Sequence, residues 1–151
     1  MLPEGSGNGD EMTIQEEIKA LKAEKDAVIL AHYYVEPEVQ ELADYVGDSF
    51  YLSKVAAGLQ CKVLVFCGVS FMGESACLLS PEKEVLMPDP AADCPMAHMV
   101  TEDEVLKYRG YYDDLAVVCY INSTAEIKSW SDVCVTSANA VDIVRRLPQK
   151  N

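Results

Sequence analysis

The fold is decided by the stretch Ala27-Val28-Ile29-Leu30-Ala31-His32-Tyr33-Tyr34, an apolar run that ends abruptly in polar and aromatic residues. Such runs are typical of strands that are buried on both faces of a parallel sheet. Ahead of it, Thr13 and Glu16 have the spacing of a capping box, and apolar residues recur at helical spacing to about Lys25. After it, Pro37 suits the first turn of a second helix. The sequence therefore begins with a helix, a buried strand and another helix.

The alternation of strands and helices continues along the first half of the chain. The apolar pattern predicts short strands at 45–46, 63–66 and 85–87, with helices over 52–59 and 70–79 between them. Strands and helices that alternate at this spacing predict a parallel sheet with helices on both faces. We therefore expect an α/β fold, with a three-layer αβα unit built on a short parallel sheet.

A proline-rich loop interrupts this pattern. Pro88, Pro90 and Pro95 exclude a regular strand or helix there. A charged helix is predicted from 101 to 109 and is expected to end at Gly110, and a buried strand is predicted over 115–119. The chain is thus predicted to divide into three parts: a flexible N-terminus (1–13), a first α/β unit (14–110, with the linker helix 101–109) and the truncated start of a second α/β unit (111–151).

An internal repeat supports this division. Shifting the sequence by 88 positions lays Glu38 on Glu126, Asp44 on Asp132 and Ser49 on Ser137, and apolar strand and helix positions match as well. A matched order of strands and helices predicts a duplicated structural unit. We expect one complete α/β unit and the first half of its repeat.

The composition limits the partners of this chain. It has 25 acidic and 12 basic residues, a formal net charge of −13, and no apolar run that approaches the roughly 20 residues of a transmembrane helix. A strongly acidic surface repels phosphate backbones and anionic lipid, so nucleic-acid and membrane partners are not expected. The first ten residues lack the features of a signal peptide, and a cytoplasmic location is expected.

Candidate functional residues follow the predicted strands, because ligands of parallel sheets bind beyond the carboxyl ends of the strands. His32 could be a satisfied structural histidine or a neutral donor to a substrate. Ser49 and Ser137 each precede a predicted helix, so each is either an N-cap or a seat for a carboxylate or phosphate. The full set of candidates at these ends is His32, Tyr34, Asp48 and Ser49 in the first unit, and Tyr120, Asn122, Thr136, Ser137 and Asn139 in the second.

The six cysteines are too far apart for a zinc ribbon or a CxxC redox motif. Cys94 differs from the others because it lies in the proline-rich loop among polar neighbours, an accessible setting of the kind that reactive or metal-binding thiolates need. His98 follows four residues later, so a nucleophilic Cys94–His98 pair and a metal ligand both remain open. The remaining cysteines lie in apolar segments and are expected to behave as small hydrophobic residues: Cys61, Cys67, Cys77, Cys119 and Cys134.

Five motifs together resemble quinolinate synthase, over about residues 14 to 148. They are Ile-Leu-Ala-His-Tyr-Tyr from Ile29, Ala-Asp-Tyr-Val-Gly-Asp-Ser from Ala43, Asp-Cys-Pro-Met-Ala from Asp93, Tyr-Ile-Asn-Ser-Thr from Tyr120 and Thr-Ser-Ala-Asn-Ala from Thr136. The resemblance implies an enzyme of NAD biosynthesis that condenses iminoaspartate with dihydroxyacetone phosphate to quinolinate. It also implies three α/β units around a cavity, each supplying one cysteine to a [4Fe–4S] cluster. A functional partner that makes iminoaspartate, L-aspartate oxidase or aspartate dehydrogenase, is implied as well.

The resemblance assigns roles to individual residues. It implies that Cys94 is the first cluster ligand and that Tyr34 is a mobile active-site tyrosine. The residues implied to bind iminoaspartate or to line its cavity are His32, Asp48, Ser49, Tyr120, Ile121, Asn122 and Ser137. The other two cluster cysteines would lie beyond Asn151, so this chain alone is not expected to hold the cluster or make quinolinate. The alternatives are a small-anion-binding module without catalysis and a Cys94–His98 hydrolase.

Overall fold

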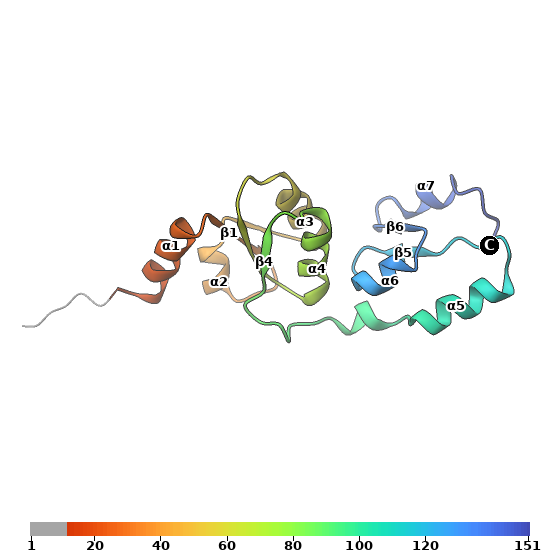
Figure 1. Ribbon diagram of the computed structural model, residues 1–151, viewed down its shortest axis with the longest axis horizontal. Coiled ribbons are helices and arrows are strands. Elements are labelled where there is room, and N and C mark those ends of the chain that lie inside the picture. Colours follow the sequence, from red (N-terminus) through yellow and green to blue (C-terminus); the bar gives the residue numbers. More distant parts are fainter. Residues whose placement is uncertain (1–11) are drawn as a thin grey trace, which may run out of the picture.

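The computed structural model describes residues 12–151, and it divides into two α/β units that lie side by side (Figure 1). The predicted N-terminal segment 1–13 falls mostly outside the described residues. The first unit contains α1 (Ile14–Glu24), β1 (Ala27–His32), α2 (Pro37–Leu42), β2 (Tyr45–Gly47), α3 (Ser49–Gly58), β3 (Val63–Cys67), α4 (Ser70–Leu79) and β4 (Glu84–Leu86). The first two helices begin where the sequence provides a start signal: Thr13 forms the predicted capping box with Glu16, and Pro37 opens α2.

The first unit has a four-stranded parallel sheet in the order β2-β1-β3-β4. Helices α3 and α4 pack on the face toward the second unit, and α1 and α2 lie on the opposite face (Figure 1). The core lies between the sheet and α3 and α4, where Leu30, Leu52, Leu64 and Phe66 are completely buried. The predicted parallel sheet with helices on both faces is therefore confirmed.

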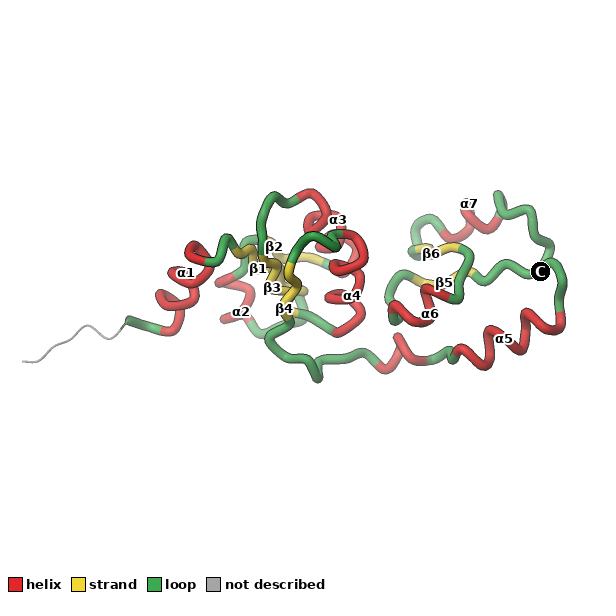
Figure 2. The backbone as a smooth tube through the Cα atoms, in the orientation of Figure 1, coloured by secondary structure: helices red, strands yellow, loops and turns green. Residues whose placement is uncertain are grey.

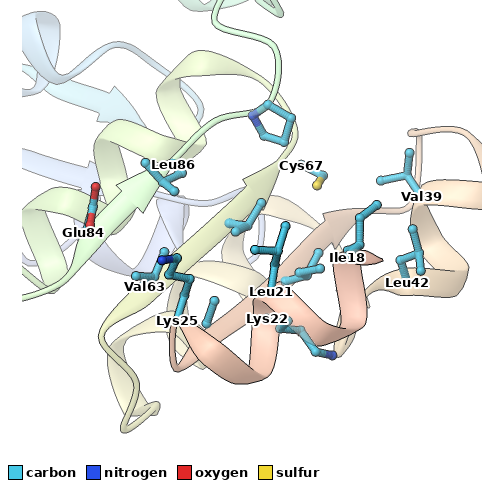
Figure 3. A pocket seen from close by; sticks show the side chains of 14 residues that line it. Ile18, Leu21, Lys22, Lys25, Val39, Leu42, Val63, Cys67, Glu84 and Leu86 are labelled. Carbon is cyan, nitrogen blue, oxygen red and sulfur yellow. The ribbon is translucent and has the colours of Figure 1, made fainter. Parts of the chain in front are cut away.

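Helices α1 and α2 do not cover their face of the sheet completely. An apolar groove of about 750 Å³ runs between α1 and the β3–β4 half of the sheet, with Leu21, Val63 and Leu86 among its lining residues (Figure 3). Helix α2 has only six residues, so it covers β1 but cannot extend across the face. The groove extends along the face of the sheet from Val63, where β3 begins, to Cys67, where it ends.

A long connection leads from β4 to the second unit (Figure 2). It contains a short 3₁₀ helix, η1 (Pro95–His98), and then α5 (Glu102–Tyr111), which runs along the outside of the second unit (Figure 1). The second unit itself consists of β5 (Val118–Tyr120), α6 (Ala125–Ser129), β6 (Val133–Val135) and α7 (Ala140–Val144), with β5 and β6 paired in parallel. None of the helices within residues 12–151 combines the length and apolar character needed to cross a membrane.

Two side chains of α4 hold the second unit against the first. A carboxylate oxygen of Glu74 accepts the Ala125 N–H at 2.7 Å, and the Lys128 ammonium donates to the Ser75 hydroxyl at 2.7 Å. Burial at this joint lowers the pKa of Lys128. The contact between α4 and α6 therefore fixes how the carboxyl ends of the two sheets meet.

The internal repeat is present in the backbone hydrogen bonds. Leu30 pairs with Tyr45 in the first sheet, and Val118 pairs with Val133 at the equivalent place in the second. Asp44 accepts the Ile29 N–H at 2.9 Å and the Lys22 ammonium at 2.8 Å. Asp132 accepts the Val117 N–H at 2.7 Å and the Arg109 guanidinium at 2.9 Å. Each unit is thus closed by an aspartate that joins its first strand to the preceding helix.

We predict that Asp44→Ala and Asp132→Ala each lower the free energy of unfolding by about 1–3 kcal/mol, because each removes hydrogen bonds to a charged group. Urea unfolding followed by circular dichroism measures the change. Asp142→Ala is the control, since its contact with Arg145 is long, at 4.0 Å, and exposed. Losses no larger than that of the control would show that these aspartates do not stabilise the units.

Several predicted boundaries were wrong by one to three residues, among them those of α5, β4 and β5. Helix α5 continues through Gly110 to Tyr111, since a glycine in an exposed last turn costs only about 1 kcal/mol. Strand β4 begins one residue earlier than predicted, at Glu84, which pairs with Val63. Strand β5 begins only at Val118, because the Ala116 N–H bonds to the Asn151 carbonyl instead of to a neighbouring strand.

Candidate functional site

The predicted site residues of the first unit lie at the carboxyl end of its sheet. The strand order reverses between β1 and β3, which is where ligands of open parallel sheets bind. His32 ends β1 there, and Gly68 follows β3 beside it. A Cβ atom on Gly68 would lie 3.6 Å from the Cβ of His32 and 2.9 Å from the Met72 sulfur. A side chain at Gly68 would therefore collide with Met72 of α4, whereas its contact with His32 would be an ordinary one.

His32 is held in one tautomer and is partly buried. Its Nδ1 accepts the Tyr34 backbone N–H at 3.2 Å, so the neutral ring carries its proton on Nε2. Burial lowers the pKa of His32, and the nearby Asp48 carboxylate opposes this shift. The Tyr34 ring lies 4.7 Å from the imidazole and is 83% exposed. At neutral pH His32 can thus donate an N–H to a ligand, beside an exposed tyrosine.

We predict that His32 is neutral at pH 7 and carries the Nε2 proton, as imidazole nitrogen NMR can determine. The pKa of His32 in the folded chain is below the ordinary value of about 6.5, which applies to the unfolded chain. At a pH between the folded and unfolded pKa values, the unfolded chain therefore binds more protons than the folded chain. The free energy of unfolding should therefore fall as the pH drops below about 6.5. A doubly protonated His32 ring at pH 7 would contradict the prediction.

Asp48, rather than Ser49, caps helix α3. The Asp48 carboxylate accepts the Tyr51 N–H at 2.8 Å, and Ser49 is the first residue of the helix. The prediction that Ser49 precedes the helix was therefore wrong by one residue, because aspartate and serine are both strong N-caps and stand side by side. The Ser49 hydroxyl is not needed for capping and remains at the helix N-terminus, where anions are favoured.

Asn122 is a candidate residue of the second unit that lies close to a candidate residue of the first unit. Ile121 and Asn122 line a small gap between the units together with Ser49 and Ser53. The Ile121 N–H also bonds to the Val135 carbonyl, which fixes the backbone after β5. Ser49 and Asn122, which are far apart in the sequence, are thus brought together.

Tyr120 and Ser137 form a separate pair, with the Ser137 hydroxyl 3.3 Å from the phenol oxygen of Tyr120. The prediction that Ser137 stands directly ahead of a helix was wrong, because α7 begins only at Ala140. The Asn139 side chain accepts the Thr136 N–H at 2.7 Å and closes a turn that contains Ser137. Asn139 therefore has the turn role that its residue type favours.

The Cys94 loop lies against the start of α4. Cys94 is partly buried and packs on the core of the first unit, and the Ser70 N–H of α4 donates to the Ala92 carbonyl at 2.9 Å. Asp93 accepts the Ser70 hydroxyl at 2.8 Å and the Cys94 N–H at 2.7 Å. These two bonds, the first contributing most, lower the pKa of Asp93. The loop is thus fixed where the carboxyl end of β3 turns into α4.

The His98 ring is hydrogen-bonded to Asp93. Its Nε2 lies 2.7 Å from an Asp93 carboxylate oxygen, and within residues 12–151 no hydrogen bond joins its ring to Cys94. The prediction that the other five cysteines pack as small hydrophobic residues was wrong for Cys77. Cys77 is exposed on α4 rather than packed in the core, whereas Cys119 is buried, and burial raises the pKa of both Cys67 and Cys134.

The described residues do not by themselves form a complete metal site. Within residues 12–151 no group of three or more histidine, cysteine, aspartate or glutamate side chains is placed to hold a metal ion. An iron–sulfur cluster is held by several cysteine thiolates, and Cys94 is one donor. The donor set of the described residues therefore does not fit a whole cluster.

The sequence analysis did not identify two residues at the carboxyl end of the first sheet, Gly68 and Ser70. Gly68 and Ser70 follow β3 as Gly47 and Ser49 follow β2, each pair a glycine at the strand end and a serine that begins the next helix. That parallel was a signal in the sequence. It was not recognised because the internal repeat relates the two halves of the chain and not adjacent strands.

Known proteins resemble this chain along nearly all of its length. Residues 16–151 match the family model described as NadA, quinolinate synthetase A protein. The chain is 62% identical over 138 residues to a quinolinate synthase of Fusobacterium nucleatum. It is 55% identical over 139 residues to one of Clostridium perfringens strain 13, and 57% identical over 134 residues to one of Clostridioides difficile.

These alignments cover 89–92% of this chain but only 44–46% of each relative. The chain thus spans somewhat less than half the length of the curated relatives it matches. The match still includes both α/β units, the Cys94 loop and all the candidate residues from His32 to Ser137. By this match, the chain belongs to the quinolinate synthase family.

Proposed function

We propose that this chain provides the iminoaspartate-binding part of a quinolinate synthase. Such an enzyme joins iminoaspartate to dihydroxyacetone phosphate by a carbon–carbon bond-forming condensation in NAD biosynthesis. The observation that carries the proposal is that Ser49 and Asn122, from two repeated units, line one gap in a chain of this family. A dicarboxylate needs donors from several directions, and such sites are built where strand ends of neighbouring units converge.

Neutral donors suit this substrate in an acidic protein. With a formal net charge of −13, the chain repels an anion at long range, so binding must depend on local groups. His32 donates from Nε2, and the first turn of α3 offers backbone N–H groups beside the Ser49 hydroxyl. Helix α4 also begins without a side-chain cap, but its Ser70 N–H already donates to the Ala92 carbonyl, so α3 provides the helix N-terminus of the proposed site.

The remaining candidates complete the proposed site. Tyr34, exposed and in contact with the His32 ring, would close over the substrate as a mobile tyrosine. Asp48 would line the cavity beside Ser49, with its carboxylate occupied as the α3 cap. The second unit would contribute Tyr120, Ile121, Asn122 and Ser137.

Cys94 would be one of the thiolate ligands of a [4Fe–4S] cluster. Support comes from its place in the proline-rich loop, which is bonded to the start of α4 at the carboxyl end of β3, whereas Cys67, Cys119 and Cys134 lie within strands. The other donors, and the contacts to dihydroxyacetone phosphate, would come from outside the described residues. Iminoaspartate would be supplied by L-aspartate oxidase or aspartate dehydrogenase, and the enzyme would act in the cytoplasm.

A hybrid polypeptide tests the proposal. The 138 residues of this chain that match the Fusobacterium nucleatum relative replace the matched segment of that relative, and the product is purified without oxygen. We expect the hybrid to form quinolinate from iminoaspartate and dihydroxyacetone phosphate. A folded hybrid without quinolinate, beside an active relative, would refute the proposal. If that inactive hybrid still bound a small dicarboxylate, the chain would be an anion-binding module instead.

A further inference from the structure

We infer that Asp93 is a positioning residue, whose carboxylate fixes the direction of the Cys94 thiol by joining three parts of the chain. The purpose of this positioning rests on the proposed function, because a thiolate ligand must point at one place. The geometry itself depends only on contacts within this chain. Asp93 makes these contacts on the surface, so it does not serve to fill the core.

Both oxygens of Asp93 are in use. Oδ1 accepts the Ser70 hydroxyl at 2.8 Å and the Cys94 N–H at 2.7 Å, and Oδ2 lies 2.7 Å from His98 Nε2. Ser70 is the first residue of α4, and His98 is the last residue of η1. One carboxylate therefore joins a helix of the sheet unit, the backbone of Cys94 and the short helix that follows it. We call these three bonds the Asp93 bracket.

The backbone on either side of Cys94 is held by other bonds. The Ala92 carbonyl accepts the Ser70 N–H, and the Cys94 carbonyl accepts the Ala97 N–H at 2.9 Å. Ala97 is buried at 3% exposure. What remains to be fixed is the peptide between Asp93 and Cys94, whose N–H is the one that Asp93 accepts. That peptide sets where the Cys94 side chain leaves the backbone, so its orientation decides where the thiol lies.

Only an acidic side chain can make this set of bonds at full strength. An asparagine has a single acceptor oxygen, so it could not accept from Ser70, Cys94 and His98 together. Hydrogen bonds to a carboxylate are roughly twice as strong as those between neutral groups. Asp89 lies in the same loop, but its carboxylate accepts the Ala91 N–H, at 2.9 Å, and belongs to a different turn.

The test measures the alkylation rate of the Cys94 thiol by iodoacetamide in residues 1–151 without iron, resolved peptide by peptide with mass spectrometry. We expect Asp93→Asn to raise the Cys94 rate about tenfold, because the remaining amide oxygen accepts from Ser70 and Cys94 only as a neutral acceptor and the carboxylate oxygen beside His98 is lost. Asp89→Asn is the matched control, because it removes the same charge from the same loop, and it should leave the rate unchanged. Labelling of the buried Cys119 serves as the internal reference for unfolding, and labelling of the exposed Cys77 serves as the reference for an accessible thiol.

A second pair of variants keeps the test decisive if Asp93→Asn misfolds. Ser70→Ala removes one bond of the Asp93 bracket without any change in charge, and it should raise the Cys94 rate several-fold. Ser70→Thr keeps the hydroxyl and should restore the original rate. The inference is overturned if Ser70→Ala leaves Cys94 labelling unchanged, or if Asp89→Asn raises it as much as Asp93→Asn. The assay involves no turnover, so an inactive hybrid would refute the proposed function while leaving this result intact.

Discussion

Replacing Cys94 by serine in the hybrid polypeptide is expected to abolish both cluster retention and quinolinate formation. A serine hydroxyl is not deprotonated at neutral pH and is a poor ligand for iron–sulfur clusters, which are held by thiolates. We expect iron bound per polypeptide to fall to background after anaerobic reconstitution and desalting. Quinolinate formation should drop by at least about 100-fold, the upper range for loss of a group that supports a metal site.

Cys77→Ser is the matched control for this prediction. Cys77 is exposed on α4 and takes no part in the candidate site, so the variant should keep its iron and its activity. Iron and quinolinate that survive in the Cys94→Ser hybrid would show that Cys94 is not a cluster ligand. The same loss in both variants would mean that this half of the hybrid is merely unstable.

Replacing His32 by asparagine is expected to lower kcat/KM of the hybrid by about 100- to 1,000-fold, because one preorganised hydrogen-bond donor to the reacting substrate is lost. The asparagine amide is too short to reach the place that Nε2 occupies. The longer glutamine side chain can place its amide nitrogen near that point. His32→Gln should therefore recover at least about tenfold of the loss.

The asparagine and glutamine variants separate two roles of His32. A histidine that only packs against Tyr33 and Tyr34 would be replaced equally well or badly by both amides. Equal activity of the two variants would therefore contradict a donor role at Nε2. Circular dichroism of both variants checks that β1 and its neighbours remain folded.

The fold could be predicted well from the sequence because its signals are local. The apolar run of β1, the Thr13 capping box and Pro37 each act within a few residues, and each prediction was confirmed. The repeat was also predictable, because it preserves Asp44 and Asp132, and both turned out to make the same pair of bonds. The failures lay at element ends, where a tertiary bond such as that of Ala116 to Asn151 replaced a strand partner.

The candidate site could be predicted only in part. The positions after strands followed from the rule for parallel sheets, so His32, Ser49 and Asn122 were identified as candidates. That Ser49 and Asn122 line one gap was not predictable, since this depends on how α4 holds α6. The bond between Asp93 and Ser70 links residues 23 positions apart and follows from no local pattern.

The measurement that tests the central claim most directly is quinolinate formation by the unmodified hybrid, beside the Fusobacterium nucleatum relative whose matched segment it replaces. If residues of this chain bind iminoaspartate and Cys94 holds a cluster, the hybrid forms quinolinate at a rate of the same order as the relative. A hybrid that folds, elutes as the relative does and forms no quinolinate would contradict the account.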